Sequence, residues 1–131
     1  MKDDLLVLLV DDKEGEFRTL EQTLHSAGIR TQRVHTCSEA RAALREPRPS
    51  RLILTATALA DGTWADVLNL ASMHGRAVPV IVVSRFVDVG LYLKTLESGA
   101  SDFIVPPFSA DDLAYLVHTA IAKNSISMTL L

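Results

Sequence analysis

The sequence of 131 residues has a single cysteine, Cys37, so no disulfide can form within the chain. One free thiol suits a reducing compartment, and we expect the protein in the cytoplasm. Basic residues are not in excess, because the sequence has 13 Lys and Arg and 16 Asp and Glu. The sequence therefore lacks the excess of positive charge that is typical of proteins that bind nucleic acid. The first apolar run, after Asp4, spans only about six residues, too few for a secretory signal or a membrane span. No glycine-rich loop follows it, which argues against a nucleotide-using enzyme.

Short apolar runs alternate with stretches of helical periodicity, a pattern typical of parallel strands joined by helices. The expected strands are Leu5–Val10, Ile29–Val34, Leu52–Ala56, Val78–Val83 and Asp102–Val105. We therefore predict an α/β fold with a single doubly wound, five-stranded parallel sheet flanked by five helices. The domain is expected to cover residues 1–122, and residues 123–131 are expected to be a C-terminal tail or the start of a linker.

A binding site in such a sheet is expected at the carboxyl ends of the strands. Asp11 and Asp12 directly follow the first expected strand, and Ser84 follows the fourth. Two adjacent carboxylates at a strand end can hold a hard cation such as Mg²⁺ through oxygen ligands. Alternatively, one of them caps the helix that follows, and the hydroxyl of Ser84 bonds backbone groups at its strand end.

Four short segments, in this order and in this strand–helix context, carry a resemblance to a known family. They are Val10–Asp12, Leu59–Thr63, Val80–Ser84 and Gly99–Phe108. Over residues 4 to about 122, the chain resembles the CheY-like receiver domain of bacterial response regulators, which serve two-component phosphorelay signalling. The resemblance implies a flavodoxin-like sheet in the order 2-1-3-4-5, with strands counted along the chain.

The resemblance also implies roles for individual residues. Asp11 and Asp12 match the acidic pair that binds the metal ion in the family. Ser84 matches the hydroxyl residue that bonds the phosphoryl oxygen, and Phe103 matches the aromatic residue that turns inward when that hydroxyl moves. Phe103 has the alternative of being ordinary core, because a switch needs a trigger.

Two positions depart from the family pattern. Ala56 stands where the family has its phosphoacceptor aspartate, and Pro106 stands where it has a lysine. The expected site therefore lacks both the nucleophile for phosphotransfer and the fixed positive charge that would stabilise it. In the family the peptide bond before the next position is cis, so the bond between Pro106 and Pro107 is a cis candidate.

The two departures compensate each other in charge. Three carboxylates and one lysine would give a net charge of −2, and two carboxylates without a lysine also give −2. This match argues that the pattern is native to the sequence. With one carboxylate fewer, Asp11 and Asp12 are expected to bind Mg²⁺ only weakly, in the millimolar range, and we expect either no cofactor or this weakly bound ion.

These observations predict a pseudo-receiver, which is a signalling module and not an enzyme, and which acts through protein contacts independently of phosphorylation. The expected partner is a kinase, an output domain or a regulator, and a homodimer through the fourth helix, fifth strand and fifth helix is also expected. Neither nucleic acid nor a membrane is expected as a partner. Two alternatives stay open: phosphorylation of a substitute residue (Asp61, Thr55, Thr57 or one of the acidic pair), and a small-molecule sensor.

Overall fold

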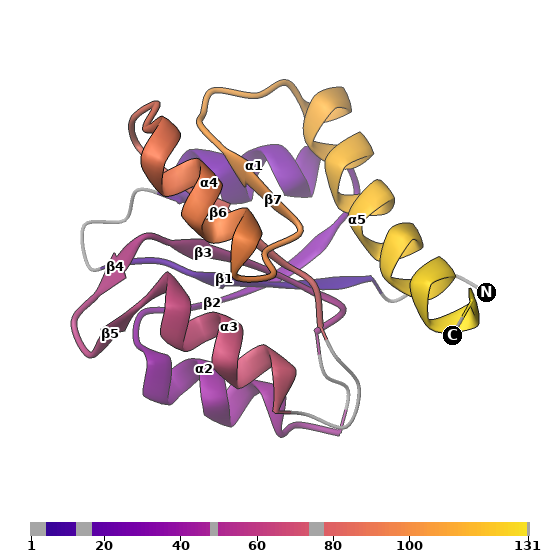
Figure 1. Cartoon of the computed structure of the whole chain (residues 1–131). Helices are drawn as coiled ribbons and strands as arrows, with labels where there is room; N and C mark the ends of the chain where they lie inside the picture. The colour runs from indigo at the N-terminus through magenta and orange to yellow at the C-terminus, as the bar shows by residue number, and fades with distance from the viewer. Residues whose placement is uncertain (1–4, 13–16, 48–49, 74–77, 131) are drawn as a thin grey trace.

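The computed structural model describes residues 5–12, 17–47, 50–73 and 78–130, with side chains described as far as residue 123. These residues form a five-stranded parallel sheet in the order β2-β1-β3-β6-β7 (Figure 1). The strands are β1 (Leu6–Val10), β2 (Arg30–Val34), β3 (Leu52–Ala56), β6 (Val80–Val83) and β7 (Asp102–Ile104). Counted within the sheet, this is the predicted order 2-1-3-4-5, so the predicted fold is confirmed.

The composition of each strand explains its place in the sheet. Every residue of β3 and of β6 is buried, as is most of β1, and their largely apolar sequences suit strands covered on both faces. The sequence of β2 is largely polar, and only Val34 within it is buried. This strand forms an edge of the sheet, as the sequence predicts.

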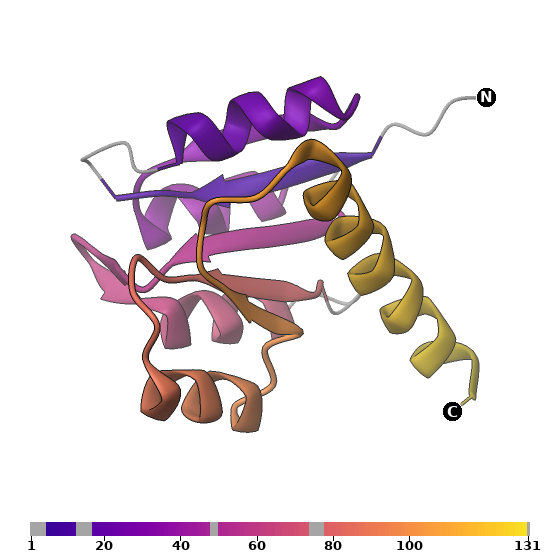
Figure 2. The same cartoon turned by 90° about the horizontal axis from the view of Figure 1, so that it is seen from above.

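Helices cover both faces of the sheet. They are α1 (Arg18–Ser26), α2 (Cys37–Leu44), α3 (Trp64–Ser72), α4 (Val89–Glu97) and α5 (Ala110–Leu130). Helices α1 and α5 pack on one face and α2 and α3 on the other, while α4 lies beside β7 (Figures 1 and 2). Successive residues of β1 alternate between the two cores, with Val7 and Leu9 on the α1–α5 side and Leu8 and Val10 on the α2–α3 side.

A small hairpin lies between β3 and α3, where the sequence predicts only a turn. Its strands, β4 (Ala58–Leu59) and β5 (Gly62–Thr63), pair antiparallel. The carboxylate of Asp61, in the turn between them, accepts hydrogen bonds from the backbone N–H groups of Cys37 (2.7 Å) and Ser38 (3.1 Å). These bonds favour the ionised carboxylate and lower the pKa of Asp61. Asp61 therefore ties the hairpin to the first turn of α2.

Helix α5 continues beyond residue 122, where the sequence analysis ends the domain. Residues 123–130 contain neither glycine nor proline, so no residue type in this segment breaks a helix. The segment expected as a tail or linker is thus helical as far as Leu130, whereas residue 131 and the first four residues lie outside the described ranges. Among the helices in these ranges, none combines the length and the apolar character that crossing a membrane requires.

Candidate functional site

A cleft of about 500 Å³ opens at the carboxyl edge of the sheet. The ends of four elements meet there: Asp12 follows β1, Ala56 ends β3, Ser84 follows β6 and Pro106 follows β7. The cleft therefore brings together four of the six positions to which the resemblance assigns roles. Among the described residues that line it, Asp12 carries the one carboxylate.

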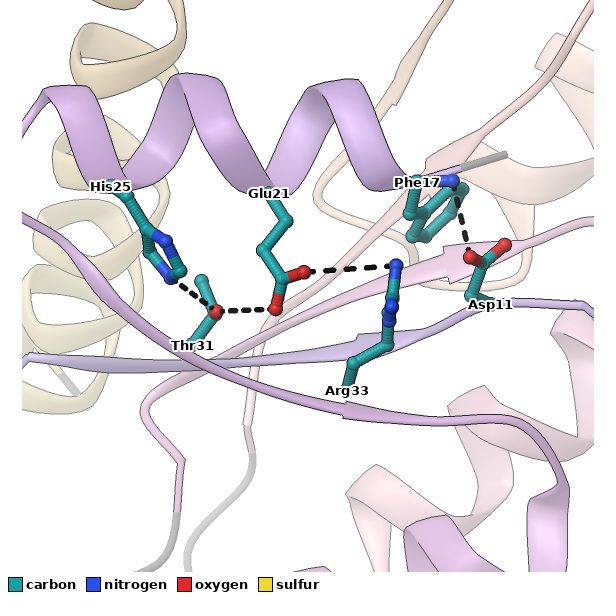
Figure 3. A network of polar contacts seen from close by, with 6 residues as sticks. All are labelled: Asp11, Phe17, Glu21, His25, Thr31 and Arg33. Atoms are coloured by element: carbon teal, nitrogen blue, oxygen red, sulfur yellow. Dashed lines mark hydrogen bonds and ion pairs between the residues drawn. The ribbon is translucent and has the colours of Figure 1, made fainter. Parts of the chain in front are cut away.

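Asp11 does not line the cleft and is completely buried. One carboxylate oxygen, Oδ2, accepts a hydrogen bond of 3.1 Å from the backbone N–H of Phe17, just before α1 (Figure 3). The other oxygen, Oδ1, is buried and has no hydrogen-bond partner among the described residues. Burial raises the pKa of Asp11, and the neighbouring charge of Asp12 raises it further. The acidic pair is therefore unequal, with one member buried and one member at the cleft.

Arg85 supplies a positive charge that the sequence analysis missed. Its guanidinium Nη2 lies 2.8 Å from Oδ2 of Asp12, and the exposed fractions of the two side chains are 46% and 24%. Arg85 directly follows Ser84 at the end of β6. Because binding sites in such sheets lie at the carboxyl ends of the strands, this position in the sequence could have identified Arg85 as a site residue. The positive charge at this site thus comes from β6 and not from the end of β7.

A second arginine, on β2, acts on the buried member of the acidic pair. Arg33 of β2 is 3.6 Å from Glu21 of α1, and its charge lowers the pKa of Asp11 in part. The hydroxyl of Thr31 donates to Glu21 and bonds His25, which extends this network along α1 (Figure 3). Arg85 and Arg33 therefore add positive charge beside Asp12 and Asp11, which the count of carboxylates in the sequence did not include.

Ala56 and Pro106, the two positions expected to depart from the family pattern, both line the cleft. Ala56 is the last residue of β3 and is only 7% exposed, so a buried methyl group occupies this position. Pro106 is exposed, and the peptide bond that joins it to Pro107 is cis. Neither residue offers a nucleophile or a positive charge to the cleft.

The hydroxyl of Ser84 is engaged with its own chain. It donates a hydrogen bond to the carbonyl oxygen of Phe86 (2.8 Å) and accepts one from the N–H of Phe86 (3.2 Å). This is the backbone-bonding alternative that the sequence analysis left open. Phe103 does not line the cleft; it is half-buried against Trp64 and Val82, and its ring meets that of Tyr92 edge to face, with centroids 5.8 Å apart.

The residues present fit a Mg²⁺ ion poorly. Oδ1 of Asp11 is a buried oxygen that a cation would satisfy. However, Arg85 is paired with Asp12, and Ala56 contributes no ligand. In the described part of the chain, no group of three or more His, Cys, Asp or Glu side chains is arranged to hold a metal ion. Mg²⁺ prefers an octahedral shell of oxygen ligands that includes at least one available carboxylate. The described residues of the cleft offer few such ligands, because the carboxylate of Asp12 is paired with Arg85.

Comparison with known proteins places these features in a family. The model of the response regulator receiver domain matches residues 7–118. The transcriptional regulatory protein KdpE of Mycobacterium tuberculosis is 30% identical over 128 residues, which are 95% of this chain and 54% of that protein. This chain therefore spans about half the length of that relative.

Solved structures agree with the fold. The signal receiver domain of a proposed Luxo repressor protein from Vibrio parahaemolyticus superposes with a TM-score of 0.81 at 23% identity, over 98% of each chain. A response regulator receiver protein from Pseudomonas putida gives a TM-score of 0.76 at 28% identity, over 91% of this chain and 99% of that one. The matched family model, which spans most of the chain, shows that the chain belongs to the family of response regulator receiver domains.

Proposed function

We propose that this receiver domain is a pseudo-receiver, which takes part in two-component signalling without accepting a phosphoryl group at the end of β3. The observation that carries the proposal is the methyl group of Ala56 in the cleft. Phosphotransfer needs a carboxylate in line with the donor phosphorus, and an alkyl group cannot serve. Such a domain is a cytoplasmic binding module and has no catalytic activity of its own.

The environments of the candidate substitute acceptors argue against each of them. Asp61 is committed to the N–H groups at the start of α2. The hydroxyl of Thr55 is buried and donates to a backbone carbonyl, and Asp12 is paired with Arg85. Asp11 is completely buried, so a phosphodonor cannot reach its carboxylate. Thr57 does line the cleft, but no base within the described residues is bonded to its hydroxyl.

The contact surface of the proposed module is the α4 face, which we define as residues 86–93 with Tyr115 of α5. Large apolar side chains are exposed there, including Phe86 (73%), Val87 (82%) and Leu93 (51%). Apolar side chains gathered in one segment are typical of an interaction site. On α5, Tyr115 is also exposed (72%), and we assign it to the same contact surface.

The proposed occupant of the α4 face is a second copy of this chain. The exposed Lys94 lies on α4, whereas the exposed Asp111 and Asp112 lie at the start of α5. In a two-fold arrangement the same surface meets itself, so α4 of one copy can face α5 of its partner with opposite charges opposed. A kinase, an output domain or another regulator would then recognise the paired module.

The absence of a phosphorylation response is tested with beryllofluoride and Mg²⁺, which together mimic an acyl phosphate. We expect the backbone amide signals of Ser84 and Phe103 to stay in place in a two-dimensional nuclear magnetic resonance spectrum. The matched control is Ala56→Asp, which returns the carboxylate. Saturable shifts of these signals in the unaltered chain would refute the proposal.

The proposed dimer is tested by sedimentation equilibrium over a range of protein concentrations. Leu93→Lys places a charge on the α4 face and is expected to convert the dimer to a monomer. Met73→Lys is the matched control, because Met73 is equally apolar and 77% exposed but lies at the end of α3, outside the α4 face. A chain that is monomeric at every concentration, or a dimer that both variants leave intact, would contradict this part of the proposal.

A further inference from the structure

We propose that the cleft binds a small aromatic carboxylate at the place where other receivers carry phosphate. This inference rests on the proposed function, since it needs a cleft that is not used for phosphotransfer. A volume of about 500 Å³ falls within the range of about 300–1,000 Å³ that is usual for small-ligand sites.

The walls of the cleft select for an aromatic ring. Phe17, Phe86 and Phe108 line it from three different segments, one before α1, one before α4 and one before α5. Ala56 and Pro106 add apolar surface at the two positions where the family has a carboxylate and an ammonium group. Flat rings pack well against phenylalanine in offset or edge-on geometry, whereas bare phosphate gains nothing from such walls.

Arg85 selects for a carboxylate on that ring. Its side chain is partly exposed, and Arg85 lines the same cleft. A guanidinium has five N–H donors in a planar fork that matches a carboxylate, so it can hold more than one anionic group at a time. The charge of Asp12 opposes a second anion, which is why the apolar walls must supply part of the affinity.

Phe86 connects this cleft to the α4 face. It lines the cleft and begins the exposed apolar segment before α4, and both of its backbone polar groups are held by Ser84. A ring bound in the cleft would pack against Phe86 and cover part of its exposed side chain. Ligand binding is therefore expected to change the association of two copies through the α4 face, in the way that phosphorylation would otherwise do.

The test is a titration of the full chain with 1-naphthoate, followed by two-dimensional nuclear magnetic resonance. We expect saturable shifts of the cleft residues, centred on Thr57, Arg85 and Phe86, with a dissociation constant of up to about 1 mM. Inorganic phosphate tests the anion without the ring, and 1-naphthylmethanol tests the ring without the charge; both are expected to bind at least about tenfold more weakly. Shifts that do not saturate, or that are as strong with either control compound, would overturn the proposal.

Two variants locate the binding site. Arg85→Gln removes the guanidinium and is expected to weaken naphthoate binding about tenfold, whereas Arg45→Gln, at the exposed end of α2 and outside the cleft, is expected to leave it unchanged. Thr19→Trp changes an exposed residue of α1 that lines the cleft, so the chain should fold while the space is filled and binding is lost. Binding that survives both Arg85→Gln and Thr19→Trp would overturn the assignment.

Failure of this inference can be told apart from failure of the proposed function. If naphthoate does not bind and beryllofluoride also leaves the spectrum unchanged, the ligand proposal is wrong while the pseudo-receiver stands. If beryllofluoride produces the shifts of an active receiver, the pseudo-receiver is wrong whatever naphthoate does.

Discussion

Placing a carboxylate at the end of β3 should destabilise this protein unless a metal ion is present. Val10 of β1 pairs with Thr55 of β3, so the next residues along the strands, Asp11 and Ala56, are neighbours at a strand spacing of about 4.8 Å. Two unit charges about 5 Å apart interact with about 3 kcal/mol at an effective dielectric constant of about 20. Because Asp11 is already completely buried, we expect Ala56→Asp to lower the free energy of unfolding by about 2–3 kcal/mol without metal.

Magnesium should reverse much of this loss in the variant and do little for the unaltered chain. With three carboxylates and a dissociation constant of about 1 mM, about 10 mM Mg²⁺ would stabilise the variant by about 1.4 kcal/mol. In the unaltered chain Arg85 is paired with Asp12, and a dissociation constant of about 10 mM gives about 0.4 kcal/mol. The predicted difference in metal response is therefore about 1 kcal/mol.

The assay is urea denaturation of both proteins with and without Mg²⁺, followed by circular dichroism. Ala56→Asn is the matched control, because its amide has the shape of the carboxylate without the charge. We expect this control to show little response to the metal. An equal gain in stability for the unaltered chain and Ala56→Asp would refute the reasoning, since it would mean that the two carboxylates present already form a complete site.

Further predictions concern the hairpin and the helix that it contacts. Burial, and then the charge of Asp61, raise the pKa of the Cys37 thiol to about 11. In the native protein at about pH 8 we therefore expect a thiol reagent to modify Cys37 only at the rate of unfolding. Rapid modification would contradict the buried position of Cys37. The pKa of Asp61 is lowered in the folded state, so its ionised form contributes stability that is present above the ordinary pKa and is lost as the pH falls below about 4. Asp61→Asn should therefore weaken the pH dependence of stability in that range, as measured by urea denaturation at several pH values, and an unchanged profile would count against it. A methyl group added at Gly62 would lie 2.6 Å from Oδ2 of Asp66 and 2.8 Å from Sγ of Cys37. Gly62→Ala should therefore lower the free energy of unfolding by about 1–3 kcal/mol. An unchanged free energy of unfolding would show that the hairpin is less tightly packed.

The sheet could be predicted because its signals are local and repeated. The buried strands β3 and β6 are largely apolar runs, and the polar composition of β2 marks an edge. The hairpin of β4 and β5 could not be predicted, because two-residue strands leave no periodicity to detect. Its stability depends instead on Asp61 meeting the start of α2, a contact between residues 23 and 24 positions apart.

The candidate site could be predicted only in part. Strand ends place Asp12, Ala56 and Ser84 at one edge of the sheet, and the cleft contains all three. The pairing of Arg85 with Asp12 was missed because it joins residues 73 positions apart through side-chain geometry, which no periodic pattern encodes. The influence of Arg33 on Asp11 was missed for the same reason, since it depends on the orientation of a long side chain across neighbouring strands.

The proposed pseudo-receiver requires that the end of β3 offers no phosphoacceptor. The most direct test is incubation of the full chain with acetyl phosphate and Mg²⁺, followed by mass spectrometry of the intact protein, with Ala56→Asp treated in parallel. We predict that the mass of the unaltered chain does not change. A gain equal to one phosphoryl group on the unaltered chain would contradict the account.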